Sequence, residues 1–342
     1  MDPHVRSEKR GALGLLTLDR PKALNALTHA MIKAISAQLG AWALDQAVAC
    51  VAIRGEGGRG FCAGGDIRAV RQAAVDGTQE GAALLAEEYH MNAQIGTYPK
   101  PYVALVHGIC MGGGAGVSVH GRYRLADASL VFAMPETAIG FVPDVGASHF
   151  LSRVPDQLGF YLGLTGQSVS LADALDLGLM THCVAQEDFE AVIAALAQGQ
   201  DVERAIAPFL RKTNPGPLSA HRRRIATIFS ASSVEAILER LERDGSEFAH
   251  ETARILRSRS PTSLKLVLRQ LKQARGLSLN QCLAMEYRLA LRILASHDFR
   301  EGVRAALVDK DRNPQWQPAS LAGVGDLDGF FAPLGNQELF LT

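Results

Sequence analysis

The chain has 342 residues, of which 47% are hydrophobic, and it carries 35 basic and 35 acidic side chains. This length can bury a substantial core, and the balanced charge creates no global field that would recruit nucleic acid or an anionic membrane. Any anionic ligand must therefore be held by a local site. The cysteines form no CxxC pair and no zinc-like Cys/His spacing, which favours reduced thiols in a cytosol-like compartment. They are Cys50, Cys62, Cys110, Cys183 and Cys282.

The first residues are polar and lead at once into strand-like sequence, which is unlike a signal or transit peptide. The longest apolar stretches are interrupted by Gly, Pro or a charge before they reach the length of a membrane span. We therefore expect a soluble, cytoplasmic protein with neither a membrane nor a nucleic-acid partner.

Strand-like and helix-like segments alternate in the first part of the chain. A strand is predicted over 11–19, and a helix runs from a Thr28 cap to about Leu44. The remaining predicted elements are strands at 48–54, 102–106, 122–126 and 130–133, a glycine-rich loop at 55–65, helical sequence from Asp66 to about Tyr98, and a second glycine loop at 112–114 that leads into a helix through Val119. This alternation is typical of an α/β fold with mainly parallel strands.

Helical periodicity dominates from about Gln157 to about Leu307, and Ser260-Pro261 begins one amphipathic helix. We predict a core over residues 1–200 that carries the active site. A mainly helical C-terminal region over residues 201–342 is expected to pack on this core.

Several common motifs are incomplete. Residues 55–60 match G-x-G-x-x-G after a strand, but no helix opens within the motif, so a surface loop is favoured over a dinucleotide site. The chain has no P-loop motif, and the segment around Ser118 lacks the second glycine of a nucleophile elbow. Its histidines show no H-E-x-x-H spacing, so no metal site is expected.

Two glycine turns, at 63–67 and 111–114, each follow a strand and precede a helix. Such turns leave backbone N–H groups without an intrahelical acceptor at the start of the helix. Two converging N–H groups could hold a carbonyl oxygen that becomes negative, and glycine lets a substrate approach the backbone closely. Each turn by itself could also be ordinary turn chemistry, so the pair is what suggests an oxyanion site.

Three segments with the glycine turns resemble, in order and spacing, the signature of the crotonase (enoyl-CoA hydratase/isomerase) superfamily. They are Arg20-Pro21-Lys22-Ala23-Leu24-Asn25-Ala26-Leu27, Phe61-Cys62-Ala63-Gly64-Gly65-Asp66-Ile67, and His107-Gly108 through Gly112-Gly113-Gly114. The resemblance implies a crotonase-like spiral of ββα units with a helical C-terminal region. It also implies a coenzyme A thioester whose carbonyl oxygen meets the N–H groups of Gly65 and Gly113.

The same resemblance implies further contacts with the substrate. Ala23, Leu24, Asp66 and Ile67 match positions where the family's backbone lines the path of adenine and pantetheine. Lys22 and Arg68 are candidate phosphate neighbours or solvated surface charges. Glu88 aligns with an acidic residue at the substrate pocket, although it could instead lie on a solvated helix face. Cys62 is interpreted as a packing residue, because nothing near it in sequence would lower the pKa of its thiol.

The carboxylates decide the chemistry within the superfamily. Hydratases carry a glutamate at the position that Gly116 occupies here, so their glutamate pair is broken, whereas Glu136 matches their second glutamate. Asp144 is a new carboxylate where hydratases have glycine, and by itself it could equally be a helix N-cap.

Longer segments around these carboxylates and in the late helices resemble the 3-hydroxyisobutyryl-CoA hydrolases of the superfamily. They are 113–121, 132–146, 260–265, 285–289 and 302–305. The resemblance implies hydrolysis of a short 3-hydroxyacyl-CoA in valine catabolism, with no cofactor, since coenzyme A is part of the substrate.

In the mechanism that we infer, Glu136 attacks the thioester or activates a water, and Asp144 binds the 3-hydroxyl group or carries a proton to the thiolate. The alternatives are an enoyl-CoA hydratase or isomerase that uses Glu136 and Asp144, and a non-catalytic acyl-CoA-binding homologue, although such a homologue would be expected to lose both carboxylates. The exact acyl group stays open. Crotonase relatives are commonly trimers or pairs of trimers, but the C-terminal region could cover that surface, so homo-oligomer, dimer and monomer also stay open.

Overall fold

The computed structural model describes residues 2–341 and divides the chain into two compact units. The first unit comprises Met1–Asp66, Glu87–Ala133 and Val169–Ser219, and the second comprises Ile67–Ala86, Met134–Ser168 and Ala220–Thr342. The predicted boundary at residue 200 lies inside the first unit. The division into a core that carries the active site and a helical region stays a prediction.

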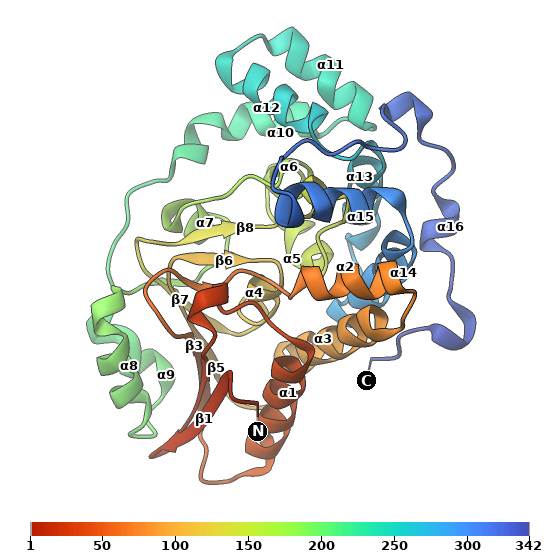
Figure 1. Ribbon diagram of the computed structural model, residues 1–342. Coiled ribbons are helices and arrows are strands. Elements are labelled where there is room, and N and C mark those ends of the chain that lie inside the picture. The colour runs from red at the N-terminus through yellow and green to blue at the C-terminus, as the bar shows by residue number, and fades with distance from the viewer. Residues whose placement is uncertain (1, 342) are drawn as a thin grey trace. The chain divides into compact units, whose positions relative to one another are not determined.

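The first unit contains all nine strands found in the described residues, and they form two sheets (Figure 1). The larger sheet has the order β1-β2-β3-β5-β7-β9 and is parallel except for the β1–β2 hairpin. The smaller sheet, β4-β6-β8, is entirely parallel. The strands are β1 Val5–Arg10, β2 Leu13–Leu18, β3 Cys50–Gly55, β4 Gly60–Cys62, β5 Tyr102–Val106, β6 Ile109–Met111, β7 Tyr123–Ala126, β8 Val131–Ala133 and β9 His182–Cys183.

From β3 onward, consecutive strands alternate between the two sheets. β3, β5 and β7 each join the larger sheet, and the strand that follows each of them, β4, β6 and β8, joins the smaller one. Each pair therefore bends sharply between its two strands, and the chain advances by one pair per turn of a spiral. This arrangement confirms the predicted crotonase-like α/β fold built on ββα units.

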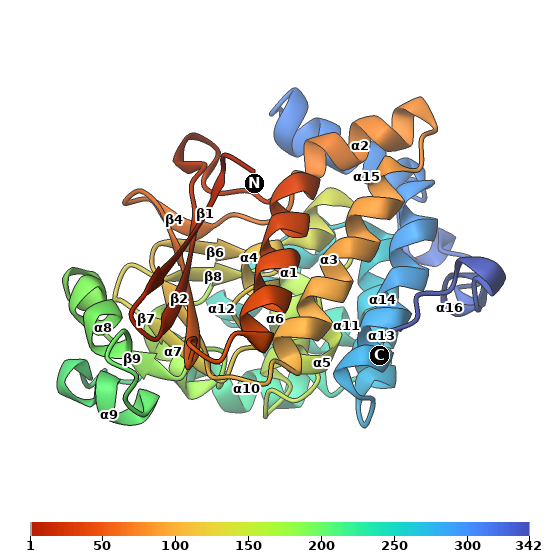
Figure 2. The ribbon, with the colours of Figure 1, turned by 90° about the horizontal axis from the view of Figure 1, so that it is seen from below.

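Helices of the first unit cover both faces of the larger sheet, with α8 and α9 on one face and α1 on the other (Figure 2). Among the described residues, the unit contains six α-helices or parts of α-helices. They are α1 His29–Leu44, α4 Gly113–Gly116, α7 Leu171–Asp176, α8 Phe189–Leu196, α9 Val202–Ile206 and the later part of α3 Glu80–Gly96. On one face of β2, Leu13 and Leu15 pack in a core cluster with residues of α8 and α9. On the other face, Gly14 lies so close to the Trp42 ring of α1 that a Cβ would be 2.7 Å from it.

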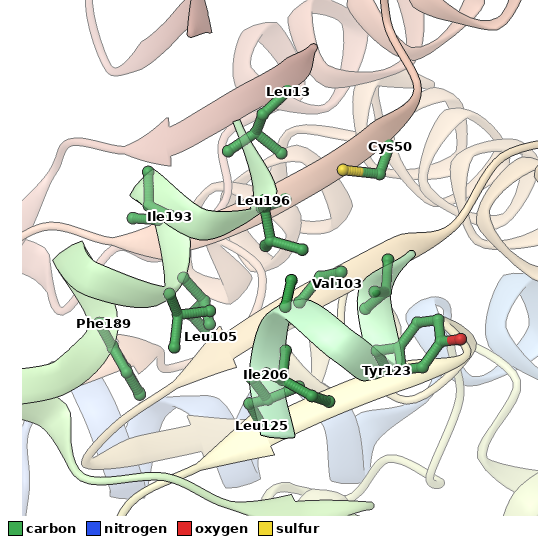
Figure 3. Close-up of a cluster of buried hydrophobic side chains, with 14 of the residues drawn as sticks. Leu13, Cys50, Val103, Leu105, Tyr123, Leu125, Phe189, Ile193, Leu196 and Ile206 are labelled. Atoms are coloured by element: carbon green, nitrogen blue, oxygen red, sulfur yellow. The ribbon is translucent and has the colours of Figure 1, made fainter. Parts of the chain in front are cut away.

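The apolar cluster between the larger sheet and α8–α9 is closely packed (Figure 3). Phe189, Ile193 and Leu196 of α8 face Val103 and Leu105 of β5, and all five side chains are buried. Burial of such side chains contributes about 1.5–3 kcal/mol each. The cluster therefore fixes β3 and β5, which directly precede β4 and β6, the strands whose carboxyl ends lead into the glycine turns.

The predicted helix after Thr28 is confirmed as α1. The Thr28 hydroxyl accepts a hydrogen bond from the Met31 N–H at 3.2 Å, which caps the helix start. Met31, Ile35 and Leu39 recur at helical spacing on the buried face.

The second unit is helical, apart from loops and single turns (Figure 1). Its helices are α2 Ile67–Asp76, α5 Ala147–Leu151, α6 Leu158–Thr165, α10 Arg222–Phe229, α11 Val234–Asp244, α12 Glu247–Arg257, α13 Pro261–Ala274, α14 Leu279–Leu294, α15 His297–Val303 and α16 Asp328–Phe331, with the first turns of α3. The predicted start of α13 is confirmed, because the Ser260 hydroxyl accepts from the Ser263 N–H and Pro261 occupies the first turn. None of the helices within residues 2–341 has both the length and the apolar character that a bilayer crossing requires.

Two predicted elements of the first unit were wrong in detail. The glycine-rich segment 55–65 is not a surface loop throughout, since Gly60, Phe61 and Cys62 form the buried strand β4. The helix expected to run through Val119 ends as the short helix α4 at Gly116. Glycine favours helix poorly, and three of the four residues of α4 are glycines, so the chain continues in separate turns.

Asn25 ties the signature loop to the segment that follows β3. Its side-chain amide donates to the carbonyl oxygens of Glu56 at 3.0 Å and Gly60 at 3.1 Å, and its Oδ1 accepts from the Arg20 N–H at 2.9 Å. Asn25 is fully buried and has a positive φ of 57°, a conformation that asparagine tolerates better than most residues.

We therefore predict that Asn25→Ala lowers the free energy of unfolding by about 3 kcal/mol, because it leaves three backbone groups without their partner. Urea unfolding followed by circular dichroism measures the change. Lys22→Ala, which alters an exposed side chain of the same loop, should change the free energy by less than about 0.5 kcal/mol. Equal stability of the two variants would contradict this assignment.

Candidate active site

The first two signature segments lie side by side in the first unit. The Leu27 N–H donates to the Gly64 carbonyl and the Asp66 N–H donates to the Leu27 carbonyl, both at 2.8 Å. Arg20 and Asp66 form a partly buried ion pair at 3.0 Å. The Ala63 N–H also donates to the Leu24 carbonyl, at 2.9 Å. The structure thus brings the loop of Ala23 and Leu24 against the turn that carries Gly65 and Asp66.

Gly65 and Gly113, the two predicted oxyanion donors, lie close to each other. A Cβ built on Gly113 would be 3.1 Å from the Gly65 nitrogen, and Gly113 is the first residue of α4. Within the described residues, neither backbone N–H donates to a protein acceptor. Two neighbouring donors without protein acceptors are the arrangement that stabilises a developing oxyanion.

Glu88 of α3 borders this pair of glycines. Its Oε1 atom lies 2.5 Å from the position that a Cβ on Gly113 would occupy, and its Oε2 atom lies 3.8 Å from the corresponding position on Gly65. The side chain is only 3% exposed, so the alternative of a solvated helix face was wrong. The structure therefore brings Gly65, Gly113 and Glu88 together.

Glu136 lies in the second unit, at the start of a single helical turn, Glu136–Ile139, after Pro135. It is 7% exposed, and its Oε2 atom has no hydrogen-bond partner among residues 2–341. Burial raises the pKa of Glu136 well above its usual range, and the negative charges of Asp144 and Glu286 raise it further. The folded protein therefore favours the neutral carboxylic acid at this position.

Asp144 lies in the same unit, is 7% exposed, and is one of the groups that raise the pKa of Glu136. It is not a helix N-cap, because the following helix α5 has Gly146 at that position and no side-chain cap. The prediction that Asp144 could be a helix N-cap was therefore wrong. Its carboxylate lies close enough to Glu136 to raise the pKa of that residue.

Sequence reasoning assigned no role to Glu286, although it lies in a segment on which the resemblance rests. Glu286 is fully buried on α14, and its carboxylate accepts from the N–H groups of Gly146 at 2.7 Å and Ser148 at 2.8 Å and from the Ser148 hydroxyl. Burial raises its pKa to about 8, in spite of these three donors. Because the partners of Glu286 lie about 140 residues earlier in the chain, no local sequence pattern around Glu286 could have indicated its role.

The other predicted positions differ in their exposure. Ile67 is the half-buried first residue of α2, while Lys22 and Arg68 are exposed. Gly116, where hydratases carry a glutamate, is buried. Burial raises the pKa of the Cys62 thiol, which agrees with its interpretation as a packing residue. Across the described part of the chain, no group of three His, Cys, Asp or Glu side chains converges as a metal site would need.

Comparison with known proteins places this chain in a family. Residues 13–328 match the profile of a family described as enoyl-CoA hydratase/isomerase. The chain is 46% identical to the 3-hydroxyisobutyryl-CoA hydrolase, mitochondrial, of Xenopus tropicalis, over 97% of this chain and 90% of that protein. It is 43% identical to the protein of the same name from Homo sapiens, over 98% of this chain and 90% of that protein.

Solved structures agree with the fold. A carnitinyl-CoA dehydratase from Mycobacterium thermoresistibile matches with a TM-score of 0.95 and 39% identity, covering 99% of both chains. An enoyl-CoA hydratase from Rhodobacter sphaeroides matches with a TM-score of 0.93 and 38% identity, covering 99% of this chain and 100% of that one. The chain therefore belongs to the enoyl-CoA hydratase/isomerase family, the crotonases, and its resemblance to this family is confirmed.

The close approach of Gly113 to Glu88 and Gly65 generates a prediction. Gly113→Ala should lower turnover of an acyl-CoA substrate about a hundredfold while the protein stays folded, because the new Cβ must displace the Glu88 carboxylate and crowd one oxyanion donor. Steady-state kinetics beside circular dichroism checks this. Gly58→Ala is the control, since Gly58 is exposed with no heavy atom within 4 Å of its Cβ position. Equal turnover in both variants would rule out the crowding effect.

The burial of Glu136 generates a second prediction, on stability. Because its folded-state pKa is raised, its contribution to stability is complete below the ordinary glutamate pKa and is lost as pH rises through the raised value. Glu136→Gln imitates the neutral form, so its unfolding free energy should exceed that of the wild type by a margin that grows as the pH rises above the ordinary glutamate pKa.

Urea unfolding at several pH values measures this margin. Glu239→Gln, which alters an exposed carboxylate on α11, should show no such growth. A margin that is constant with pH would show that Glu136 is already ionised in the folded protein.

Proposed function

We propose that this chain hydrolyses a short-chain 3-hydroxyacyl-CoA thioester, 3-hydroxyisobutyryl-CoA first of all, to the free hydroxy acid and coenzyme A. The observation that carries the proposal is the set of acidic residues. Glu136 is present and buried beside the charge of Asp144, while Gly116 supplies no carboxylate at the first hydratase position. The high identity to hydrolases of this name over nearly the whole chain supports the same substrate.

Each part of the mechanism is supported within its own unit. In the first unit, the N–H groups of Gly65 and Gly113 are the donors for the thioester oxygen, and Glu88 borders them. The loop of Ala23 and Leu24 packs on the turn of Asp66, where the family's backbone lines the coenzyme A path.

In the second unit, Glu136 is the reacting carboxyl group. The raised pKa of Glu136 means that it must lose its proton before it reacts, and the ionised carboxylate, which lacks a donor on one oxygen, is then a stronger base and nucleophile than a solvated one. In direct attack, a Glu136 oxygen bonds to the acyl carbon, the C–S bond breaks, and the coenzyme A thiolate leaves and takes up a proton. Water then cleaves the mixed anhydride to the hydroxy acid and restores Glu136. In the alternative, Glu136 removes a proton from the water that attacks.

Asp144 is proposed to hold the 3-hydroxyl group of the substrate or to carry the proton to the thiolate. A buried carboxylate that accepts a hydrogen bond from this hydroxyl would favour acyl groups that carry the hydroxyl over those that lack it.

A second candidate function is hydration or isomerisation of an enoyl-CoA with Glu136 and Asp144 as the acid–base pair. The two carboxylates are coupled electrostatically, and similar solved structures bear the names hydratase and dehydratase. Hydration leaves coenzyme A esterified, whereas hydrolysis releases a thiol, so the two functions differ in product.

The setting of the reaction is also proposed. The names of the Xenopus tropicalis and Homo sapiens hydrolases say mitochondrial. The cytoplasmic location expected for this chain, a role in valine catabolism and the homo-oligomeric state stay predictions. No separate cofactor enters the proposed reaction.

Purified protein supplied with 3-hydroxyisobutyryl-CoA should release free thiol, and with crotonyl-CoA it should leave the double bond intact. Glu136→Ala should lower thiol release at least about a hundredfold, with an unchanged circular dichroism spectrum. Loss of the double bond without thiol release would replace the proposed function by hydration. No turnover of either substrate would favour a non-catalytic acyl-CoA-binding protein.

A further inference from the structure

The turn that carries Asp144 is held by two buried polar side chains from α13 and α14. On the α14 side, the Glu286 carboxylate accepts from the N–H groups of Gly146 and Ser148 and from the Ser148 hydroxyl. On the α13 side, the Gln270 amide donates to the Pro143 carbonyl at 2.7 Å. Glu286 and Gln270 are both fully buried.

The backbone between these two anchors is strained. Val145 has a positive φ of 53°, which a β-branched residue rarely adopts, and Gly146 follows with a φ of 85°. Such conformations cost on the order of 1–3 kcal/mol and persist only where the surroundings hold them. The anchors at Pro143, Gly146 and Ser148 flank Asp144 and Val145, so they hold the turn at the point where it is strained.

Burial of a carboxyl group at position 286 is an unfavourable way to connect α14 to the start of α5. An apolar side chain would fill the same space without burying a carboxyl group, although the N–H groups of Gly146 and Ser148 would then need other acceptors. Within residues 2–341, the hydrogen bonds of the Glu286 carboxyl group all go to Gly146 and Ser148, in the turn that follows Asp144. Its position therefore favours a role in the placement of Asp144 over general packing.

We propose that Glu286, assisted by Gln270, is a positioning residue that fixes the strained Pro143–Ser148 turn and thereby sets the location of the Asp144 carboxylate. Glu286 acts through Asp144 and does not itself touch the substrate. This inference rests on the proposed function, in which Asp144 contacts the substrate or the departing thiolate.

The test combines kinetics and hydrogen exchange. Glu286→Gln keeps the shape of the side chain but replaces one acceptor oxygen by an amide, which cannot accept from the N–H groups of the turn. We expect kcat for thiol release to fall about tenfold with KM changed less than about twofold, since small displacements of a reacting group cost rate more than binding. Deuterium uptake by the peptide that contains residues 144–148 should rise.

A double-mutant cycle separates positioning from a merely structural role. In an Asp144→Asn background, Glu286→Gln should lower kcat by less than about twofold, because the group that it positions is already altered. Arg288→Gln is the matched control on α14, because the Arg288 side chain pairs with Glu338 at 2.7 Å and, in the described part of the chain, forms no hydrogen bond or ion pair with the turn. It should leave both kcat and the uptake at 144–148 unchanged. If Glu286→Gln does not fold, Gln270→Met removes the other anchor and should change kcat and uptake in the same direction.

Equal kcat losses in the two backgrounds, or unchanged uptake at 144–148, would overturn the proposal. If the wild type releases no thiol, the proposed function fails, and the exchange measurement alone then decides whether Glu286 fixes the turn.

Discussion

Burial of the Glu136 carboxyl group is the constraint on which the site in the second unit depends. Its Oε2 atom has no hydrogen-bond partner within residues 2–341, and the charges of Asp144 and Glu286 raise its pKa beyond the effect of burial. A fold optimised only for stability would pair or remove such a group. The unit instead provides donors to Glu286, which holds the neighbouring turn, and leaves Glu136 available for reaction.

In the first unit, the site depends on a different constraint. The backbone of the turn after β6 must come very close to the backbone of the turn after β4. Because the strands alternate between two sheets, the segments after β4 and β6 meet, and their glycines bring the two N–H donors together. A Cβ on Gly114 would lie 2.3 Å from the Cys62 carbonyl oxygen, so this approach requires glycine. The donors at Gly65 and Gly113 therefore follow from packing that any side chain would prevent.

The features that could be predicted from the sequence are those that depend on local residue patterns. The cap at Thr28 and the helical spacing of Met31 and Ile35 give α1, and the three signature segments gave the family and the ββα spiral. The sequence did not predict β4 or β6, because three-residue strands leave too short a pattern to distinguish from a glycine loop. Nor did it identify the role of Glu286, whose contacts depend on a turn about 140 residues earlier that only the tertiary fold brings near. The predicted site residues stay predictions, now with burial and neighbours that fit their roles.

The most direct test of this account is the protonation state of Glu136 in the folded protein, measured by the infrared difference spectrum between the wild type and Glu136→Gln across pH. The account predicts a protonated carboxyl band that persists at about pH 6, well above the range of an ordinary glutamate, and that disappears only as the pH rises further. At about pH 6, Glu286, whose pKa burial raises to about 8, is protonated in both proteins, so its band largely cancels in the difference at that pH. A carboxylate band alone at about pH 6, with a midpoint near the ordinary glutamate value, would contradict the account.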